Sequence, residues 1–349
     1  MLPYWLLFGL FAVGATLGPR DRAHAGGGGG PLLAVCAIFM ALMIGLRYEV
    51  GADWNQYEWL FKVAGRVNLE RLMLRGDPGY QVLNWAVRQL GGAMWQVNLI
   101  CALIFCWGLL RLAREQPQPW LAMVVAIPYL VTVVSMGYTR QAVAIGILMA
   151  GLASIHRGGS ILRYAGYVAL AALFHKTAVI ALPLVVFSGQ RNVILNLLLG
   201  ASLSILFYNL FLENSVDNLL RNYIDAGYSS QGAATRIALN FIPAILYLVK
   251  QSDFGFDDRE RKVYRYFSYA AVFFPIALYL SPSSTAIDRL ALYILPLQLV
   301  ILSRVPMAYR LPGFGTFLVI AYSAAILFGW LTFAKHAEYW LPYQLYPIG

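Results

Sequence analysis

The chain has 349 residues, of which 60% are hydrophobic, and its 26 Lys or Arg and 16 Asp or Glu residues give a net charge of +10. Soluble domains are about 45–50% apolar and about 25% charged, so this composition excludes a cytosolic enzyme and a disordered chain. The basic residues lie at the ends of apolar runs, whereas a nucleic-acid-binding protein gathers them on a solvated face. The composition therefore indicates an all-α protein that crosses a membrane many times.

A membrane-spanning helix needs about 20 mostly apolar residues. The apolar runs predict about twelve such helices in one transmembrane domain over residues 1–349, with an interfacial segment at 47–93 and a second outer loop at 213–235. The first run lacks the basic start of a signal peptide, so we expect it to be retained. The predicted spans are 2–18, 31–46, 94–112, 119–137, 139–155, 162–174, 177–189, 193–212, 236–250, 264–280, 289–303 and 313–333.

The distribution of Lys and Arg over the loops predicts the orientation, because cytoplasmic loops carry an excess of them. With the first residue outside, the inside loops hold 14 basic residues and the outside loops hold 6 when the long segment 47–93 is left aside. Only His175-Lys176 separates 162–174 from 177–189, and one kinked helix there would give eleven spans. Two separate spans keep the basic loop 250–265 inside, which favours twelve.

Three polar segments have simpler interpretations. Residues 26–30 are consecutive glycines before a proline, which predicts a linker at the inner side, because Gly and Pro are the poorest helix formers. Residues 82–90 alternate apolar and polar positions with the period of a helix, which indicates a helix at the membrane interface. Residues 252–265 carry charges of both signs and predict a solvated connector at the inner side.

A first candidate site follows the second predicted span. Arg47 lies directly at the end of an apolar helix, and Gly51, Asp53 and Tyr57 follow it within ten residues. Charged groups at membrane depth are costly and often functional. The alternative is an aromatic belt with ordinary solvated charges.

A second candidate site joins four predicted spans that start from the outer face. Each has a cation in or beside its first turn, where the helix dipole favours an anion. Helix N-termini with Arg side chains are typical of phosphate sites, so the pattern indicates a strongly anionic ligand. The alternative is that one or two of these cations reach lipid phosphates, Arg236 first and Arg140 last. The four cations are Arg140, Lys176, Arg236 and Arg289.

His175 lies beside Lys176 on the same face, at a break in the hydrophobic pattern. It is a candidate general base, because imidazole accepts protons near neutral pH. A buried hydrogen-bonding role is the alternative. No His, Cys and carboxylate spacing suggests a metal site, and no cofactor is predicted.

Six short motifs occur in an order that resembles the EpsG family of Wzy-like exopolysaccharide polymerases. The resemblance covers most of the chain, and Trp54 stands where many relatives have Tyr. The motifs are Arg47-Tyr-x-x-Gly-x-Asp53-x-x-x-Tyr57, Asp77-Pro-Gly-Tyr80, Tyr138-x-Arg140-Gln141, Phe174-His175-Lys176, Ile287-Asp288-Arg289-Leu290 and Trp340-Leu-Pro-Tyr343.

This resemblance implies a metal-independent, membrane-embedded glycosyltransferase of GT-C-like architecture in the bacterial inner membrane, with its active site facing the periplasm. Such an enzyme moves a growing glycan from undecaprenyl diphosphate to a sugar hydroxyl of a lipid-linked repeat unit. Candidate partners are this lipid-linked oligosaccharide, membrane lipids, a chain-length regulator and a flippase, and no nucleic acid.

The predicted roles follow from the chemistry of that transfer. A leaving diphosphate needs fixed positive charge, and the attacking hydroxyl needs a base. We expect His175 or Asp53 to be the base, and we expect diphosphate contacts from Arg47, Arg140, Arg289 and Lys176. Substrate contacts are expected from Gln141, Asp77, Tyr80, Tyr57, Asp288 and Tyr343. A ligase of the O-antigen type and a transporter or flippase of lipid-linked glycans remain alternatives.

Overall fold

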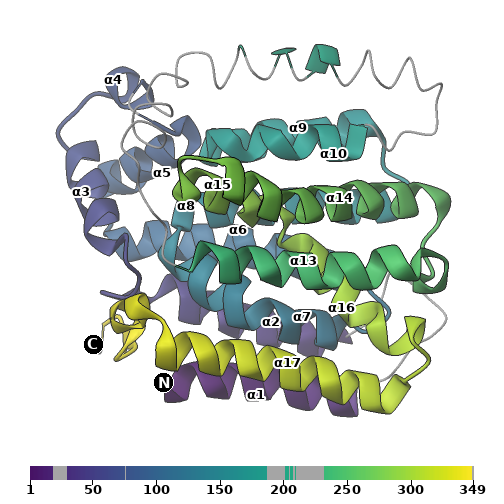
Figure 1. Ribbon diagram of the computed structural model, residues 1–349. Helices are drawn as coiled ribbons and strands as arrows, with labels where there is room; N and C mark the ends of the chain where they lie inside the picture. Colours follow the sequence, from purple (N-terminus) through teal and green to yellow (C-terminus); the bar gives the residue numbers. More distant parts are fainter. Residues whose placement is uncertain are drawn as a thin grey trace.

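The computed structural model describes residues 1–18, 30–74, 76–186, 201–203, 205–206, 209 and 232–347. Within them the chain is a bundle of helices, which confirms the all-α prediction (Figure 1). Two-residue strands β1 (Arg47–Tyr48) and β2 (Gln344–Leu345) pair antiparallel. The glycine run 26–30, the predicted span 193–212 and the loop 213–235 lie largely outside the described residues.

The helices follow the predicted spans closely in the first half of the chain. Two of the helices begin where the sequence supplies a cap or a proline: Ser160 caps the start of α9, and Pro119 is the first residue of α7. The elements are α1 (Leu2–Leu17), α2 (Gly30–Gly45), α3 (Trp54–Ala64), α4 (Leu69–Met73), α5 (Pro78–Gln89), α6 (Met94–Arg114), α7 (Pro119–Ala126), the π-helix η1 (Ile127–Ser135), α8 (Thr139–His156) and α9 (Ile161–Phe174).

The second half begins at a break in the helical chain. His175 is extended, with φ of −157°, and the chain then runs back beside α9, so the described residues 162–186 form two helical segments and not one kinked helix. The remaining elements are the 3-10 helix η2 (Lys176–Ile180), α10 (Ala181–Val186), α13 (Ala233–Val249), η6 (Gln251–Phe254), α14 (Asp258–Leu280), α15 (Ser284–Ala291), η7 (Leu292–Ile294), α16 (Pro296–Ala308), α17 (Pro312–Phe333) and η8 (Lys335–Trp340).

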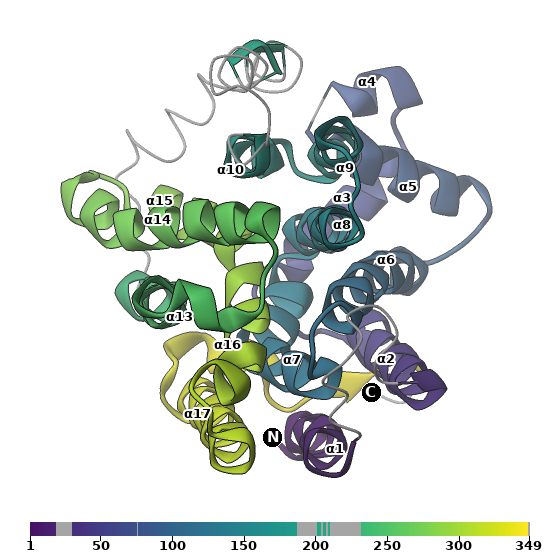
Figure 2. The same ribbon diagram turned by 90° about the vertical axis from the view of Figure 1, so that its right-hand side faces the viewer.

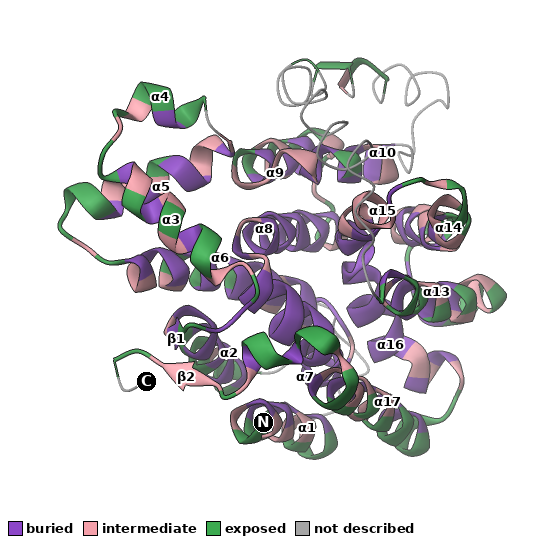
Figure 3. Ribbon diagram, turned by 60° about the vertical axis from the view of Figure 1, so that its left-hand side comes forward, coloured by how far each residue is buried: buried purple, intermediate pink, exposed green. Residues whose placement is uncertain are grey.

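Three described helices, α6, α14 and α17, are long and apolar enough to cross a membrane on their own. A fourth arises if α15–η7 and α16, which meet at an angle of 49°, form one span. The other apolar helices are shorter, so the count of twelve stays a prediction. Outward-facing residues of the peripheral helices include large apolar side chains such as Leu6, Leu10 and Phe317, which suits a lipid environment (Figure 3).

Helix α8 lies in the middle of the bundle and is buried on almost every side (Figures 2 and 3). It packs closely on α6, because a Cβ atom at Gly108 would overlap the carbonyl oxygen of Gly146. A Cβ at Gly146 would in turn lie 2.6 Å from the Cα of Phe105. Small residues that let two backbones approach are typical of helix pairs in membranes. This contact fixes where α8 sits along and around its axis.

The segments that we predicted to be outer lie together at one end of the bundle. This end, called the site end below, holds α3, α5 and α15, the first residues of α8, and η8 (Figure 1). The starts of α8, η2 and α13, which carry Arg140, Lys176 and Arg236, are at the same end. The predicted grouping of these cations at one end is therefore correct, but Arg289 lies in the last turn of α15, so the prediction that it stands at a helix start is wrong.

The C-terminal segment fastens the site end to the N-terminal helices. The indole of Trp340, which is fully buried, donates to the carbonyl of Thr132 at 2.7 Å, and Trp340 accepts at its carbonyl from the Tyr4 hydroxyl at 2.9 Å. The hydroxyl of Tyr343 donates to the carbonyl of Met43 at 2.6 Å. Tyr343 thus has a bond that anchors the chain, besides the substrate contact expected of it.

Gly51 has a structural reason for its place between Arg47 and Asp53. Its φ is +106°, its amide donates to the Tyr339 carbonyl at 2.8 Å, and a Cβ there would overlap the carbonyl oxygen of Met136. A side chain would therefore meet both strain and a backbone clash. We expect Gly51→Ala to destabilise the protein by roughly 1–3 kcal/mol, measured as a lower Tm in detergent. Gly9→Ala, on an open helix surface, should leave the Tm unchanged. Equal melting of both variants would contradict this interpretation.

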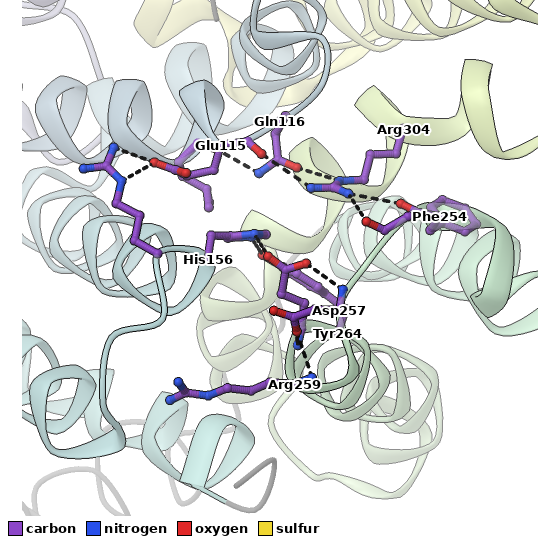
Figure 4. A network of polar contacts seen from close by, with 12 residues as sticks. Glu115, Gln116, His156, Phe254, Asp257, Arg259, Tyr264 and Arg304 are labelled. Carbon is purple, nitrogen blue, oxygen red and sulfur yellow. Dashed lines mark hydrogen bonds and ion pairs between the residues drawn. The ribbon is translucent and has the colours of Figure 1, made fainter. Parts of the chain in front are cut away.

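The opposite end of the bundle is closed by a polar network (Figure 4). His156 contacts the Glu260 carboxylate and the Tyr264 hydroxyl, the latter at 2.6 Å. Arg304, which is buried, donates to Gln116 at 2.9 Å and to the Phe254 carbonyl at 3.0 Å.

The prediction that 252–265 is a solvated connector is correct for its exposed charges and wrong for Glu260 and Tyr264. Asp257 accepts from the Arg259 and Glu260 amides and begins α14. Glu260 and Tyr264 lie one turn apart and face the end of α8, a contact between distant parts of the chain that loop composition does not reveal.

Candidate active site

Asp77 joins three of the predicted site residues at the site end. It is the residue before Pro78, the first residue of α5. Its Oδ2 accepts from Arg140 Nη1 at 2.8 Å and lies 3.4 Å from His175 Nδ1, and its Oδ1 accepts from the Lys176 amide at 3.1 Å. Asp77, Arg140, His175 and Lys176 are called the Asp77 cluster below. The structure therefore brings α5, α8 and the break after α9 to one point.

The charge on Asp77 is held in place by its neighbours. Burial alone would raise the pKa of this carboxyl group, but the His175 hydrogen bond and charge, the Arg140 charge and the Lys176 amide together lower the pKa below its ordinary value of 3.8. Asp77 is thus ionised at any physiological pH. Because the side chain of Asp77 is only 7% exposed, its carboxylate interacts with these partners more than with solvent.

Two buried tyrosines support the Arg140 side of this cluster. The guanidinium carbon of Arg140 lies 5.9 Å from the ring centre of Tyr57, and the Arg140 amide donates to the Tyr57 hydroxyl at 3.5 Å. Tyr57 meets Tyr80 edge-on, with ring centres 5.7 Å apart. Both rings are buried, so Tyr57 and Tyr80 position Arg140. The side chain of Arg140 keeps 24% exposure, which leaves part of its cationic surface open.

The next residue of α8 reaches a second group. The side-chain amide nitrogen of Gln141 donates to the backbone carbonyl of Arg289 at 2.7 Å. The guanidinium carbon of Arg289 lies 3.8 Å from the ring centre of Tyr138. Asp288 accepts two hydrogen bonds from Arg236, at 2.8 and 2.7 Å. These five residues are called the Arg289 cluster. Consecutive residues of one helix, Arg140 and Gln141, therefore connect the two clusters.

Asp53 directly precedes α3. The charges of Arg140 and Arg289, one from each cluster, both act on its carboxyl group. Burial raises the pKa of its carboxyl group above 3.8, against the opposing charges of Arg289 and Arg140. A raised pKa makes a carboxylate a better proton acceptor, which keeps Asp53 a candidate for proton transfer.

The raised pKa of Asp53 has a consequence for stability. The folded state favours the protonated carboxyl, so this stability is present below pH 3.8 and is lost as pH rises through the folded pKa. Asp53→Asn, which imitates the neutral form, should melt at a higher temperature than the unchanged protein at pH 7, and the difference should vanish below pH 3.8. The exposed Asp253→Asn is the matched control. A lower Tm for Asp53→Asn at pH 7 would contradict the raised pKa.

Arg47 is placed differently from the other predicted diphosphate ligands. It is 1% exposed, and its guanidinium donates to the Ile44 carbonyl at 2.6 Å, the Val50 carbonyl at 3.2 Å and the Thr139 hydroxyl at 2.8 Å. These bonds join the end of α2 to the start of α8. The arrangement favours a structural role for Arg47.

The structure thus brings together most predicted site residues, and it adds others. Arg236, for which contact with lipid phosphates is the alternative interpretation, donates two hydrogen bonds to Asp288, and its contact with a lipid phosphate stays a prediction. Tyr138 supports Arg289, and a Thr177–Tyr293 hydrogen bond of 2.9 Å ties η2 to η7 beside them. Spacing of cations in the sequence pointed to Arg236, but only the fold shows its partner. Among the described residues, no group of three or more His, Cys, Asp and Glu residues is arranged to hold a metal ion.

A sequence model of the EpsG family matches residues 32–345, nearly the whole chain. The chain belongs to the EpsG family. EpsG proteins are Wzy-like polymerases, so the chain is a membrane protein of the polysaccharide-polymerase class. Comparisons with curated proteins and with solved structures give no match. All six EpsG-like motifs lie at the site end or fasten it.

Proposed function

We propose that this EpsG protein transfers a growing glycan from undecaprenyl diphosphate to a sugar hydroxyl of a lipid-linked repeat unit. The proposal places it in the bacterial inner membrane as a polytopic, GT-C-like and metal-independent glycosyltransferase with the site end facing the periplasm. It is supported by family membership and by one observation above all. Arg140, held by Asp77 beside His175, and Arg289, whose carbonyl accepts from the Gln141 side chain, lie at one end of the bundle.

The two arginines supply what a diphosphate leaving group requires. Negative charge develops on the leaving oxygen as the sugar–phosphate bond breaks, and fixed cations there lower the barrier. The Arg140 guanidinium is held by Asp77 near the Tyr57 ring. The Arg289 guanidinium lies over the Tyr138 ring, and the Arg289 backbone accepts from the Gln141 side chain. The backbone amide of Lys176 donates to Asp77, and we propose that its ammonium supplies a third cation. Arg47 is left out, because its donors hold the backbone.

His175 is the proposed general base, and Asp77 positions it. The Asp77 carboxylate lies on the Nδ1 side of the imidazole, which leaves Nε2 as the nitrogen for the attacking hydroxyl. The proton of the acceptor sugar passes to Nε2 while its oxygen attacks the anomeric carbon and the diphosphate leaves. Asp53, with its raised pKa, is the second candidate for this proton.

Arg140→Ala and His175→Ala each test this assignment in cells. We expect lipid-linked single repeat units to accumulate and polymer to fall by about 10²–10³-fold, the usual cost of removing one such group. Arg163→Ala, an exposed arginine of α9 at the opposite end, is the matched control and should polymerise normally. Polymer of normal length from both site variants would refute the catalytic roles.

A purified protein incubated with a synthetic lipid-diphosphate repeat unit separates the alternatives. A polymerase gives a ladder of products from this single substrate. A ligase leaves it unchanged until another acceptor is added, and a flippase moves it across vesicles without joining it. Either of these two outcomes would overturn the proposal.

A further inference from the structure

A groove of about 600 Å³ opens between α13 and α17, and it shares only Arg236 with the two clusters of the candidate site. These helices lie on one side of the bundle (Figure 2). The floor comes from Tyr129 of η1, and the wall that α17 supplies carries Tyr322, Ile326, Gly329, Trp330 and Phe333. These positions recur every three or four residues, so they form one face of α17. At 1.5 Å per residue this face is about 16 Å long.

The groove is apolar along its length and basic at one end. Arg236, Lys335 and His336 line it at the start of α13 and just beyond α17, which is the site end of the bundle. Arg236 binds Asp288, the neighbour of Arg289, so the basic rim continues into the Arg289 cluster. A ligand that fits has one apolar chain and an anionic head.

Three groove residues also carry buried polar atoms without a partner among the described residues. They are the hydroxyls of Tyr129 and Tyr322 and the indole nitrogen of Trp330. Tyr129 is only 4% exposed. Buried donors without a partner are costly, so they are commonly satisfied by a ligand or by water. Two independent observations, the basic rim and these donors, therefore point to an amphiphile with acceptor oxygens.

We propose that this groove holds the head-proximal part of a polyprenyl diphosphate lipid, with its diphosphate at Arg236, Lys335 and His336. The inference rests on the proposed function and names the place where one lipid-linked substrate enters. A single groove suits one isoprenoid chain better than the two acyl chains of a phospholipid. Three basic groups suit a diphosphate better than a singly charged phosphodiester. Asp288, which accepts from Arg236 at this rim, directly precedes Arg289 in the chain, so a diphosphate bound here lies close to Arg289.

Gly329 allows a direct test, because a Cβ there meets no atom within 4 Å. A large side chain at this position fills the groove without displacing protein. The purified full chain in nanodiscs is labelled with a polyprenyl diphosphate that carries a diazirine in its first isoprene units. We expect labelled peptides from α17, and we expect labelling to fall in the order Ala, Leu, Phe at position 329, by about tenfold for Gly329→Phe. Gly166→Phe, on an open face of α9, is the matched control and should label normally.

Polymerisation by the same variants gives an independent readout. Gly329→Phe should raise the KM for the lipid-linked substrate about tenfold, with an unchanged Tm. Labelling that phosphatidylglycerol removes as well as unlabelled polyprenyl diphosphate would show an ordinary membrane lipid and overturn the proposal. So would Gly329→Phe with normal KM and labelling. Specific labelling of α17 by a protein that makes no polymer would keep the groove and reject the polymerase function.

Discussion

Asp77→Asn is expected to lower polymer formation at least about 100-fold, the largest effect of any single conservative change at the site. Asn keeps the shape of Asp77 and can still accept a hydrogen bond from the Lys176 amide. It loses the charge that orients Arg140 at 2.8 Å and His175 at 3.4 Å. One substitution therefore disturbs both the proposed diphosphate ligand and the proposed base. The measurement is the amount of lipid-linked single repeat units relative to polymer in cells.

The control and the stability of this variant separate a site effect from misfolding. Glu58→Gln removes an exposed carboxylate paired with Lys62 at 2.9 Å and should leave polymer unchanged. Because the pKa of Asp77 is lowered, its ionisation stabilises the fold above pH 3.8, and this contribution is lost as pH falls through the folded pKa. The difference in Tm between the unchanged protein and Asp77→Asn should therefore shrink on acidification. Normal polymer from Asp77→Asn would show that the Asp77 cluster is only structural.

Arg304→Met is expected to cause the largest loss of stability, roughly 3–5 kcal/mol, because it leaves a buried polar network without its cation. Arg304 is 3% exposed, donates to Gln116 and to the carbonyls of Phe254 and Glu115, and stacks over Phe256 at 4.1 Å. Met fills similar volume but donates nothing, so these acceptors lose their partner. The measurement is Tm in detergent, together with the folded fraction by gel filtration.

The matched change Lys262→Met removes an exposed cation of α14 at the same end and should leave the Tm unchanged. The folded fraction of Arg304→Met should retain activity per molecule, because Arg304 lies at the end of the bundle opposite to the Asp77 cluster. Unchanged stability would show that Figure 4 depicts a network that contributes little to folding.

Much of the helical fold was predictable, for a plain reason. In a membrane every backbone group must be bonded within its segment, so an apolar run of sufficient length can only be a helix. The runs before Gly18, Arg114 and Phe333 became helices with nearly the predicted ends. The break at His175 was also visible, because a polar pair interrupts the apolar pattern there.

The candidate site was predictable in its residues but not in its bonds. A cation near the start of a predicted span is visible in sequence, and all four of these cations lie at one end of the bundle, although Arg289 is in the last turn of α15. Which of them faces a ligand depends on partners that are distant in the chain. Arg47 donates to Thr139, which is 92 residues away in the chain, and Arg236 donates to Asp288, which is 52 residues away. The spacing of residues along the sequence predicts neither the Arg47–Thr139 pair nor the Arg236–Asp288 pair.

The close approach of Gly108 and Gly146 has a mechanical consequence for the distant site. Arg140 and Gln141 lie six and five residues, about 9 and 7.5 Å, along α8 from Gly146, and they bond to the two clusters. Any translation or rotation of α8 therefore moves the side chains of Arg140 and Gln141 together. A methyl group at Gly146, which no substrate would touch, would shift the geometry of leaving-group and base recognition at once.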